Sequence, residues 1–242
     1  NPLAVERATF LINKINNKST IDQIKSWIDL GCKNLLQGSL LVAKLRYPDL
    51  NEEKITSFFN QVKQDVWIEL NDNLTAMEKI AVVNKVMFTI HSFEGNREDY
   101  YDSKNSFINK AITNKTGTPL TIGIIYAIIC QDLDIPVYGV NLPHHFVLAY
   151  QDEQSLPIMQ EELSEPGILF YINPFNNGSI FGKREVIDFL VENKVSPDKK
   201  HFVPCSNKQI IKRMINNIVV AFEKEKKEEH MNTFKDLLTI FN

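Results

Sequence analysis

The segment from Leu120 to Leu133 is apolar on nearly every side, and it constrains the fold more than any other feature of the chain. Thr118 is a residue type that caps helices, and Pro119 suits the first helical position. A helix that is hydrophobic all round has to lie inside a protein. The sequence therefore predicts a buried central helix, with strands at residues 137–140, 145–150 and 168–172 that pair across it.

The residues before this unit have the pattern of helices. Apolar side chains recur at three- and four-residue steps from Asn51 to Leu70 and from Thr75 to His91, which is typical of amphipathic helices that pack on a core. Trp67 and Met77 fall on the apolar faces. Thr75 with Glu78 has capping-box spacing, so the second helix is expected to start there.

The residues after the strands also indicate helices. Residues 183–195 look helical and exposed, and residues 207–241 look like two helices separated by a run of Glu and Lys, with one long helix as the alternative. We therefore expect an α+β fold with helices before and after a central core. The expected regions are an N-terminal helical region at 1–92, the core at 93–182 and a C-terminal helical region at 183–242. These regions either are separate or form one compact domain.

The charges are close to balance, with 27 Lys and Arg against 30 Asp and Glu. Such a chain lacks the excess of positive charge that is typical of proteins that bind nucleic acid or anionic lipid. Its longest apolar run is far shorter than the roughly 20 residues that span a bilayer, and its first residues lack the layout of a signal peptide. We expect neither a nucleic acid nor a membrane as partner.

The three cysteines, Cys32, Cys130 and Cys205, are too scattered for a disulfide framework or a zinc site. We therefore expect a cytoplasmic protein with reduced thiols. Cys130 is late in the apolar helix, where burial raises a thiol pKa, and the other two have no activating context. His144 and His145 are either strand-end polar residues or part of a site, but adjacent strand positions grip one ion poorly. We expect no metal and no cofactor.

Residues 93–109 are polar and turn-rich but carry several aromatic residues. In one interpretation they form a recognition surface around exposed tyrosines. In the other, which these residue types favour, the tyrosine rings are buried and the short polar side chains hold backbone turns. If the segment does bind a partner, the candidate binding residues are Asn96, Asp99, Tyr100, Tyr101, Asn105 and His144.

Four short motifs follow one another along the middle of the chain, and Arg46–Leu50 precedes them. They are Glu94–Asp102, Asn105–Asn109, Gly117–Thr121 and Leu142–Phe146. Together they closely resemble the bacterial SirB-one family of transglutaminase-like proteins, from about residue 37 to about residue 182. The resemblance implies a papain-like transglutaminase core, which is a central buried helix packed on an antiparallel sheet.

The resemblance also implies where a catalytic site would lie. In active transglutaminase-like enzymes a nucleophilic cysteine opens the central helix, a histidine begins a later strand, and an aspartate begins the next. Counting back from Pro136, the cysteine position is Pro119. His145 matches the histidine, and Asn173 stands where the aspartate is expected; asparagine orients an imidazole in papain-like proteases. His144 replaces what is usually a glycine.

Two functions follow from this pattern. The first is a catalytically silent transglutaminase-like module that acts by protein interaction or regulation, with another protein as its partner. The second is a hydrolase or acyltransferase of altered chemistry, in which Thr118 or Thr121 is the nucleophile and His145 the base. Loss of a nucleophile costs orders of magnitude in rate, and a threonine hydroxyl replaces a thiol only when strongly activated. The residues favour the silent module.

Overall fold

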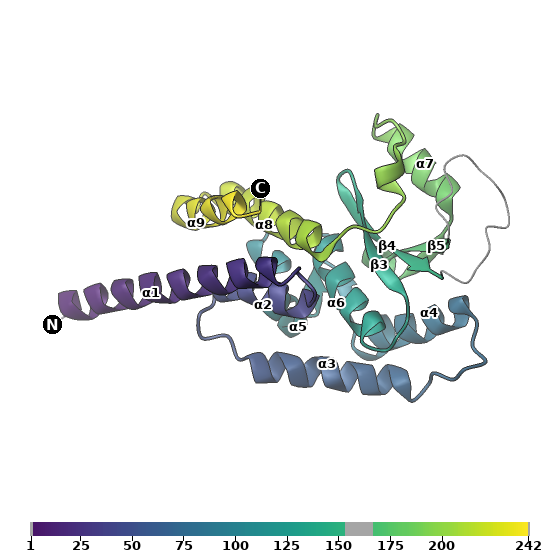
Figure 1. Ribbon diagram of the computed structural model, residues 1–242, viewed down its shortest axis with the longest axis horizontal. Coiled ribbons are helices and arrows are strands. Elements are labelled where there is room, and N and C mark those ends of the chain that lie inside the picture. The colour runs from purple at the N-terminus through teal and green to yellow at the C-terminus, as the bar shows by residue number, and fades with distance from the viewer. Residues whose placement is uncertain (1, 153–166, 242) are drawn as a thin grey trace.

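The apolar stretch after Thr118 forms helix α6 (Pro119–Gln131), and every residue from Pro119 to Cys130 is buried. The helix lies at the centre of the computed structural model (Figure 1), which describes residues 2–152 and 167–241, with side chains from residue 15 onward. Thr118 caps α6 by accepting a hydrogen bond from the Thr121 backbone N–H, and proline occupies the first turn. The predicted buried central helix is confirmed.

An antiparallel sheet of four strands packs on α6, with the strands side by side in chain order. The turn between the first two strands is two residues long, because Leu142 pairs with His145. The predicted α+β fold with an antiparallel sheet is therefore confirmed. The strands are β3 (Val137–Leu142), β4 (His145–Gln151), β5 (Ile168–Asn173) and β6 (Ser179–Phe181).

Both faces of the sheet are buried. Alternate residues of a strand point to opposite faces, and in β4 the side chains of Phe146 and Leu148 join the core around α6. Val147 and Ala149 belong to a second cluster that includes residues of α7 (Lys183–Glu192). The sheet thus lies between α6 and α7, as Figure 1 shows.

The helices before the sheet differ from the sequence pattern in detail. One regular helix was expected from Thr75 to His91, but α4 continues into a π-helix at Lys85–Ile90. Trp67 and Met77 are 67% and 57% exposed rather than on the core face, since they lie in the last and first turns of their helices. These helices are α1 (Pro2–Asp29), α2 (Leu35–Lys44), α3 (Glu52–Trp67) and α4 (Ala76–Asn84).

The segment between the π-helix and α6 is ordered by short elements. Strand β1 (Glu94–Gly95) pairs in parallel with β2 (Thr116–Gly117), which brings the two ends of the segment together. Between them lie a 3-10 helix at Ser103–Ser106 and α5 (Ile108–Asn114). The segment therefore starts and ends beside the N-terminus of α6.

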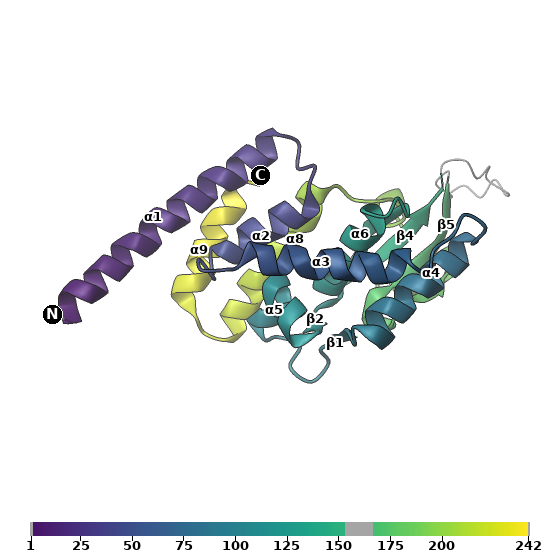
Figure 2. The same cartoon turned by 90° about the horizontal axis from the view of Figure 1, so that it is seen from below.

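Two helices end the chain, as the two-helix interpretation predicted. They are α8 (Asn207–Lys224) and α9 (Glu228–Thr239), and Lys226 between them has a left-handed φ of 57°. Short 3-10 helices at Pro174–Asn176 and Lys199–His201 flank α7. Figure 2 shows α9 on the side of the molecule where α1 begins, away from the sheet.

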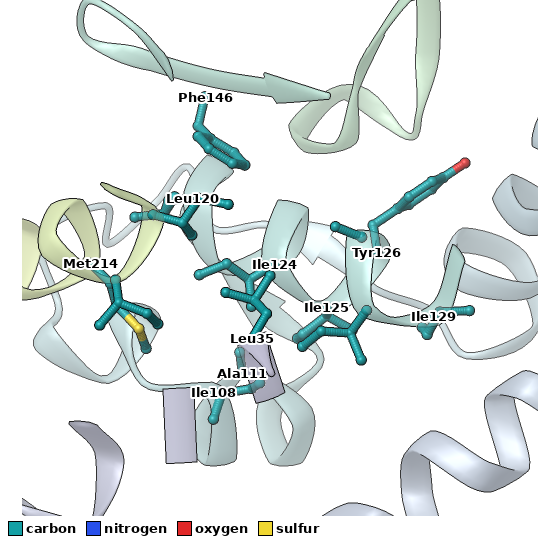
Figure 3. Packing of buried hydrophobic residues seen from close by; sticks show 14 of the residues in the cluster. Leu35, Ile108, Ala111, Leu120, Ile124, Ile125, Tyr126, Ile129, Phe146 and Met214 are labelled. Carbon is teal, nitrogen blue, oxygen red and sulfur yellow. The ribbon is translucent and has the colours of Figure 1, made fainter. Parts of the chain in front are cut away.

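One hydrophobic cluster includes residues from Ile24 of α1 to Phe241 near the C-terminus. Figure 3 shows its centre, where Ile124 and Ile125 of α6 lie between Phe146 on one side and Ile108 and Ala111 on the other. Across residues 2–152 and 167–241, no helix combines the length and the apolar character needed to cross a bilayer.

Candidate functional site

A cavity of about 280 Å³ lies at the N-terminus of α6, where the first turn of that helix meets the β3–β4 turn. We call it the His145 cavity. Its lining residues come from the 93–107 segment, the first turn of α6, the β3–β4 turn with the start of β4, and α8. They are Tyr100, Tyr101, Pro119, Leu120, His144, His145, Phe146, Arg213 and Asn217.

His145 is the first residue of β4, and its ring packs near Phe189 of α7, with 5.8 Å between ring centroids. The ring forms a hydrogen bond with the Asn173 side chain at the end of β5. Burial lowers the pKa of His145, the hydrogen bond to Asn173 opposes this shift, and the charge of Arg213 adds to it. His145 is therefore neutral at pH 7 and held by Asn173.

Asn173 has a second role, because its Oδ1 accepts a hydrogen bond of 3.1 Å from the Phe175 backbone N–H. It therefore caps the 3-10 helix that follows β5 while it contacts the His145 ring. The two residues that the family resemblance relates to a catalytic histidine and its orienting residue are thus brought together in space.

The lowered pKa of His145 predicts a dependence of stability on pH. The unfolded chain has an ordinary histidine pKa of about 6.5, so it binds more protons than the folded protein just below that pH. The contribution of neutral His145 is therefore complete above about pH 6.5 and is lost as the pH falls toward the folded-state pKa. The free energy of unfolding, measured in urea between pH 7.5 and 5, should fall less steeply for His145→Gln than for the wild type. Equal slopes would contradict the prediction.

His144 lies in the turn between β3 and β4 and not in a strand. Its φ is 59°, and its side chain is exposed at the edge of the cavity. A residue without a Cβ adopts this left-handed conformation most easily. The backbone at this position thus suits the glycine that the family resemblance places there.

The two threonines do not face His145 across the cavity. Thr118 and Thr121 are 5% and 1% exposed, and neither lines the cavity. Their Oγ1 atoms lie 2.9 Å apart and share a hydrogen bond, and Oγ1 of Thr118 also accepts from the Thr121 backbone N–H. Both hydroxyls serve the helix cap, and the first turn of α6 presents Pro119 and Leu120 to the cavity.

The three cysteines lie outside the cavity. Cys130 is fully buried at the far end of α6, and burial raises its pKa well above the ordinary thiol value. Burial also raises the pKa of Cys32. Cys205 donates to the Gly139 carbonyl at 3.2 Å, and burial raises its pKa to about 11. None of the three has a stabilised thiolate.

The polar residues of the 93–107 segment shape it from within. Asn105 is 3% exposed, and its Nδ2 donates to the Asp99 carbonyl at 2.7 Å. Its Oδ1 accepts from Asn96, whose own Oδ1 accepts from the Asp99 backbone N–H at 3.0 Å. Ser103 N–H donates to Glu225 at the end of α8. The side chains of Asn96 and Asn105 therefore fix the backbone of the segment through hydrogen bonds, while the Asp99 side chain is exposed.

The two tyrosines of this segment are exposed, in contrast to the structural interpretation that expected buried rings. Tyr100 and Tyr101 are 40% and 53% exposed, and their rings meet edge to face at 5.3 Å. The segment thus combines both interpretations, since its asparagines order the backbone and its tyrosines border the cavity.

Arg213 and Asn217 were not among the sequence-predicted site residues, although both line the cavity. They come from α8, about seventy residues after His145 in the chain. A signal was present, because an arginine and an asparagine four residues apart border the apolar stripe of Ile210 and Met214. Among the described residues, no group of His, Cys, Asp and Glu side chains is arranged to hold a metal ion.

Comparison with known proteins identifies the fold family. The family model described as the transglutaminase-like superfamily matches residues 53–216, which is more than half of the chain. The chain belongs to the transglutaminase-like superfamily. The matched residues contain α6, the whole sheet, and the part of α8 that carries Arg213. Apart from Asn217, the residues that line the His145 cavity therefore lie within the transglutaminase-like region.

Similar proteins occur in bacteria and in mammals. A UPF0162 protein of Xylella fastidiosa strain 9a5c is 26% identical over 190 residues, which are 76% of this chain and 63% of that protein. A UPF0162 protein of Vibrio cholerae is 23% identical over 82% of this chain and 70% of its own length. F-box only protein 21 of Mus musculus is 25% identical over 90% of this chain.

The transglutaminase-like chain spans only part of several of these relatives. It covers 63% of the Xylella protein and 31% of the mouse protein. No solved structure matches the chain.

Proposed function

We propose that this transglutaminase-like chain is catalytically silent and binds another protein at the His145 cavity. The observation that carries the proposal is Pro119, which lines the cavity at the first position of α6. The family resemblance assigns this position to the nucleophilic cysteine, and proline has no nucleophilic side chain. His145 and Asn173 remain paired there without a thiol to activate.

The other possible nucleophiles support the same proposal. A reactive thiol needs access and a stabilised thiolate, and the pKa values of Cys32, Cys130 and Cys205 are all raised by burial. The buried Thr118 and Thr121 hydroxyls are already bonded to each other. These contacts disfavour the alternative of a hydrolase or acyltransferase that uses a threonine.

The relatives support a role as a module. Similar sequence occurs in the bacterial UPF0162 proteins and in about a third of F-box only protein 21, as expected for a unit that is joined to different neighbours. Within the superfamily we propose a SirB-one-type member that forms one compact domain, because one hydrophobic cluster includes residues from α1 to the C-terminus. The free described cysteines support the proposal of a cytoplasmic protein.

The silent-module proposal predicts no thiol-dependent transglutaminase, deamidase or peptidase activity. With glutamine peptides and a primary amine as substrates, the wild type should give no turnover above that of His145→Ala, because no Cys, Ser or Thr among the described residues lines the cavity. Iodoacetamide should label Cys130 of the folded protein slowly, since the thiol is buried with a raised pKa. Mass spectrometry measures both results.

Pro119→Cys is the positive control, because it places a thiol in the cavity beside His145. Its new thiol should react with iodoacetamide faster than any wild-type cysteine. Wild-type acyl transfer that disappears in His145→Ala would overturn the proposal. Activity that survives removal of all cysteines but disappears in Thr121→Ala would establish the hydroxyl mechanism instead.

A further inference from the structure

Arg213 is a cation without a carboxylate partner in the described part of the chain. Its side chain is only partly exposed, and no Asp or Glu of residues 15–152 or 167–241 forms an ion pair with it. Burial lowers the pKa of Arg213, yet a guanidinium stays charged at any physiological pH. A partly buried charge of this kind is costly unless other groups or a ligand compensate it.

The protein holds this guanidinium in a fixed position by one of its nitrogens. Nη1 donates to Asn141 Oδ1 at 3.1 Å and to the Leu142 carbonyl at 2.8 Å. The guanidinium also lies over the Phe146 ring, 5.9 Å from its centroid. An arginine has five N–H donors, so the Nε and Nη2 donors remain, and neither donates a hydrogen bond to a described residue.

The surroundings of Arg213 in the cavity supply further donors. Tyr100 contributes a hydroxyl and Asn217 an amide, while no Asp or Glu among the described residues lines the cavity. The charge of Arg213 acts on both Tyr100 and His145, which places the three side chains near one another. On the outer side, Lys224 lies over the Tyr101 ring at 5.6 Å. The cavity therefore has a fixed positive charge and no fixed negative one.

We propose that the His145 cavity binds a carboxylate of the partner protein, with Arg213 as the cation that holds it. This inference rests on the proposed function, since it names the group that the silent cleft recognises. The free edge of the guanidinium fits a carboxylate through two parallel N–H···O bonds. Exposed Tyr100 and Tyr101 border the cavity and provide ring surface for the adjoining peptide.

The charge and size of the cavity favour a carboxylate over a phosphate group. Phosphopeptide sites use clusters of arginines to balance a doubly negative group, whereas Arg213 is the single arginine among the described residues that line the cavity. A volume of about 280 Å³ accommodates one terminal residue or one acidic side chain. The carboxylate therefore comes from a chain terminus or from an Asp or Glu side chain.

Titration of the folded protein with short peptides tests the inference, with the NMR signals of the His145 ring as the readout. The probes are acetyl-Ala-Ala-Phe with a free carboxylate, the same peptide with a C-terminal amide, and acetyl-Ala-Glu-Ala and acetyl-Ala-Gln-Ala as amides. At least one acidic peptide should bind about tenfold or more tightly than its neutral counterpart, since a charged hydrogen bond is lost in the neutral one. Whether the terminal acid or the glutamate peptide binds identifies the source.

Variants show whether Arg213 is responsible. Arg213→Gln should lose the preference for the acidic peptide, and Arg213→Lys should weaken it about tenfold, because lysine keeps the charge but not the planar fork. If circular dichroism shows that Arg213→Gln does not fold, the preference of Arg213→Lys for the acidic peptide decides whether Arg213 binds the carboxylate. The matched control is Arg97→Gln, since Arg97 also lies over a phenylalanine ring but outside the cavity; it should bind like the wild type.

Two outcomes would overturn the carboxylate inference. Acidic and neutral peptides that bind equally, or not at all, would show that no carboxylate is recognised. Inorganic phosphate that shifts the His145 ring signals, while the acidic peptides do not shift them, would indicate a phosphate site instead. Neither result bears on the proposed catalytic silence. The same samples analysed by mass spectrometry for hydrolysis or deamidation of the glutamine peptide test the proposed function separately.

Discussion

Replacing Phe146 by alanine should lower the free energy of unfolding by about 3–5 kcal/mol, which is the cost of removing a large buried aromatic ring. The ring is 1% exposed and lies between two glycines. A Cβ at Gly123 of α6 would come within 2.7 Å of the ring, and a Cβ at Gly139 of β3 within 2.5 Å. Because neither glycine has a side chain that can fill the space, we expect a loss in the upper part of that range.

Urea denaturation followed by circular dichroism measures this effect. Tyr101→Ala is the control, because it also removes an aromatic ring from the cavity lining but one that is 53% exposed. Its cost should be within about 1 kcal/mol. A loss of less than about 1 kcal/mol for Phe146→Ala would show that the sheet does not depend on this ring for its packing on α6.

Gly178→Ala should destabilise the protein by about 2–5 kcal/mol. Gly178 has a φ of 70°, where an alanine costs roughly 1–2 kcal/mol. In addition, the new Cβ would overlap Oδ1 of Asn84. That oxygen accepts from the Tyr126 hydroxyl at 2.9 Å, and Nδ2 of Asn84 donates to the Gly178 carbonyl at 2.9 Å. Moving Asn84 breaks these part-buried hydrogen bonds at a further cost of about 1–3 kcal/mol.

Gly31→Ala is a matched control that measures the cost of the left-handed backbone conformation alone. Gly31 has a φ of 83°, but no atom lies within 4 Å of the position of a Cβ. It should therefore cost only the roughly 1–2 kcal/mol of the left-handed conformation. In an Asn84→Ala background the obstacle at Gly178 is gone, so Gly178→Ala should cost no more than Gly31→Ala does. Equal losses for the two glycines in the wild-type background would refute the role assigned to Asn84.

Much of the core could be predicted because its cause is local composition. The residues of α6 are apolar on every side, and no arrangement except burial satisfies them. The first three strands after α6 are six or seven residues long and largely apolar, and the two-residue turn at Pro143 and His144 pairs β3 with β4. The same reasoning failed for Trp67 and Met77, which have the right spacing but lie at helix ends where the core no longer covers them.

The site was predicted only in part. His145 and Asn173 follow from motifs at strand ends, and their contact depends on the pairing of β4 with β5, which the sequence indicates. Exposure of Tyr100 and Tyr101 was not predictable from the local sequence, because Asn96 and Asn105 turn the backbone through hydrogen bonds that only the folded segment forms.

The sequence by itself determined that α6 is buried, that strands follow it and pair across it, and that a proline stands at its first position. Only the tertiary structure decided what else surrounds that position. Arg213 reaches the cavity because α8 packs beside α6 and the β3–β4 turn, where Asn141 and Leu142 fix its guanidinium. Contacts between residues about seventy positions apart depend on how whole helices pack, and no local pattern of side chains encodes that arrangement.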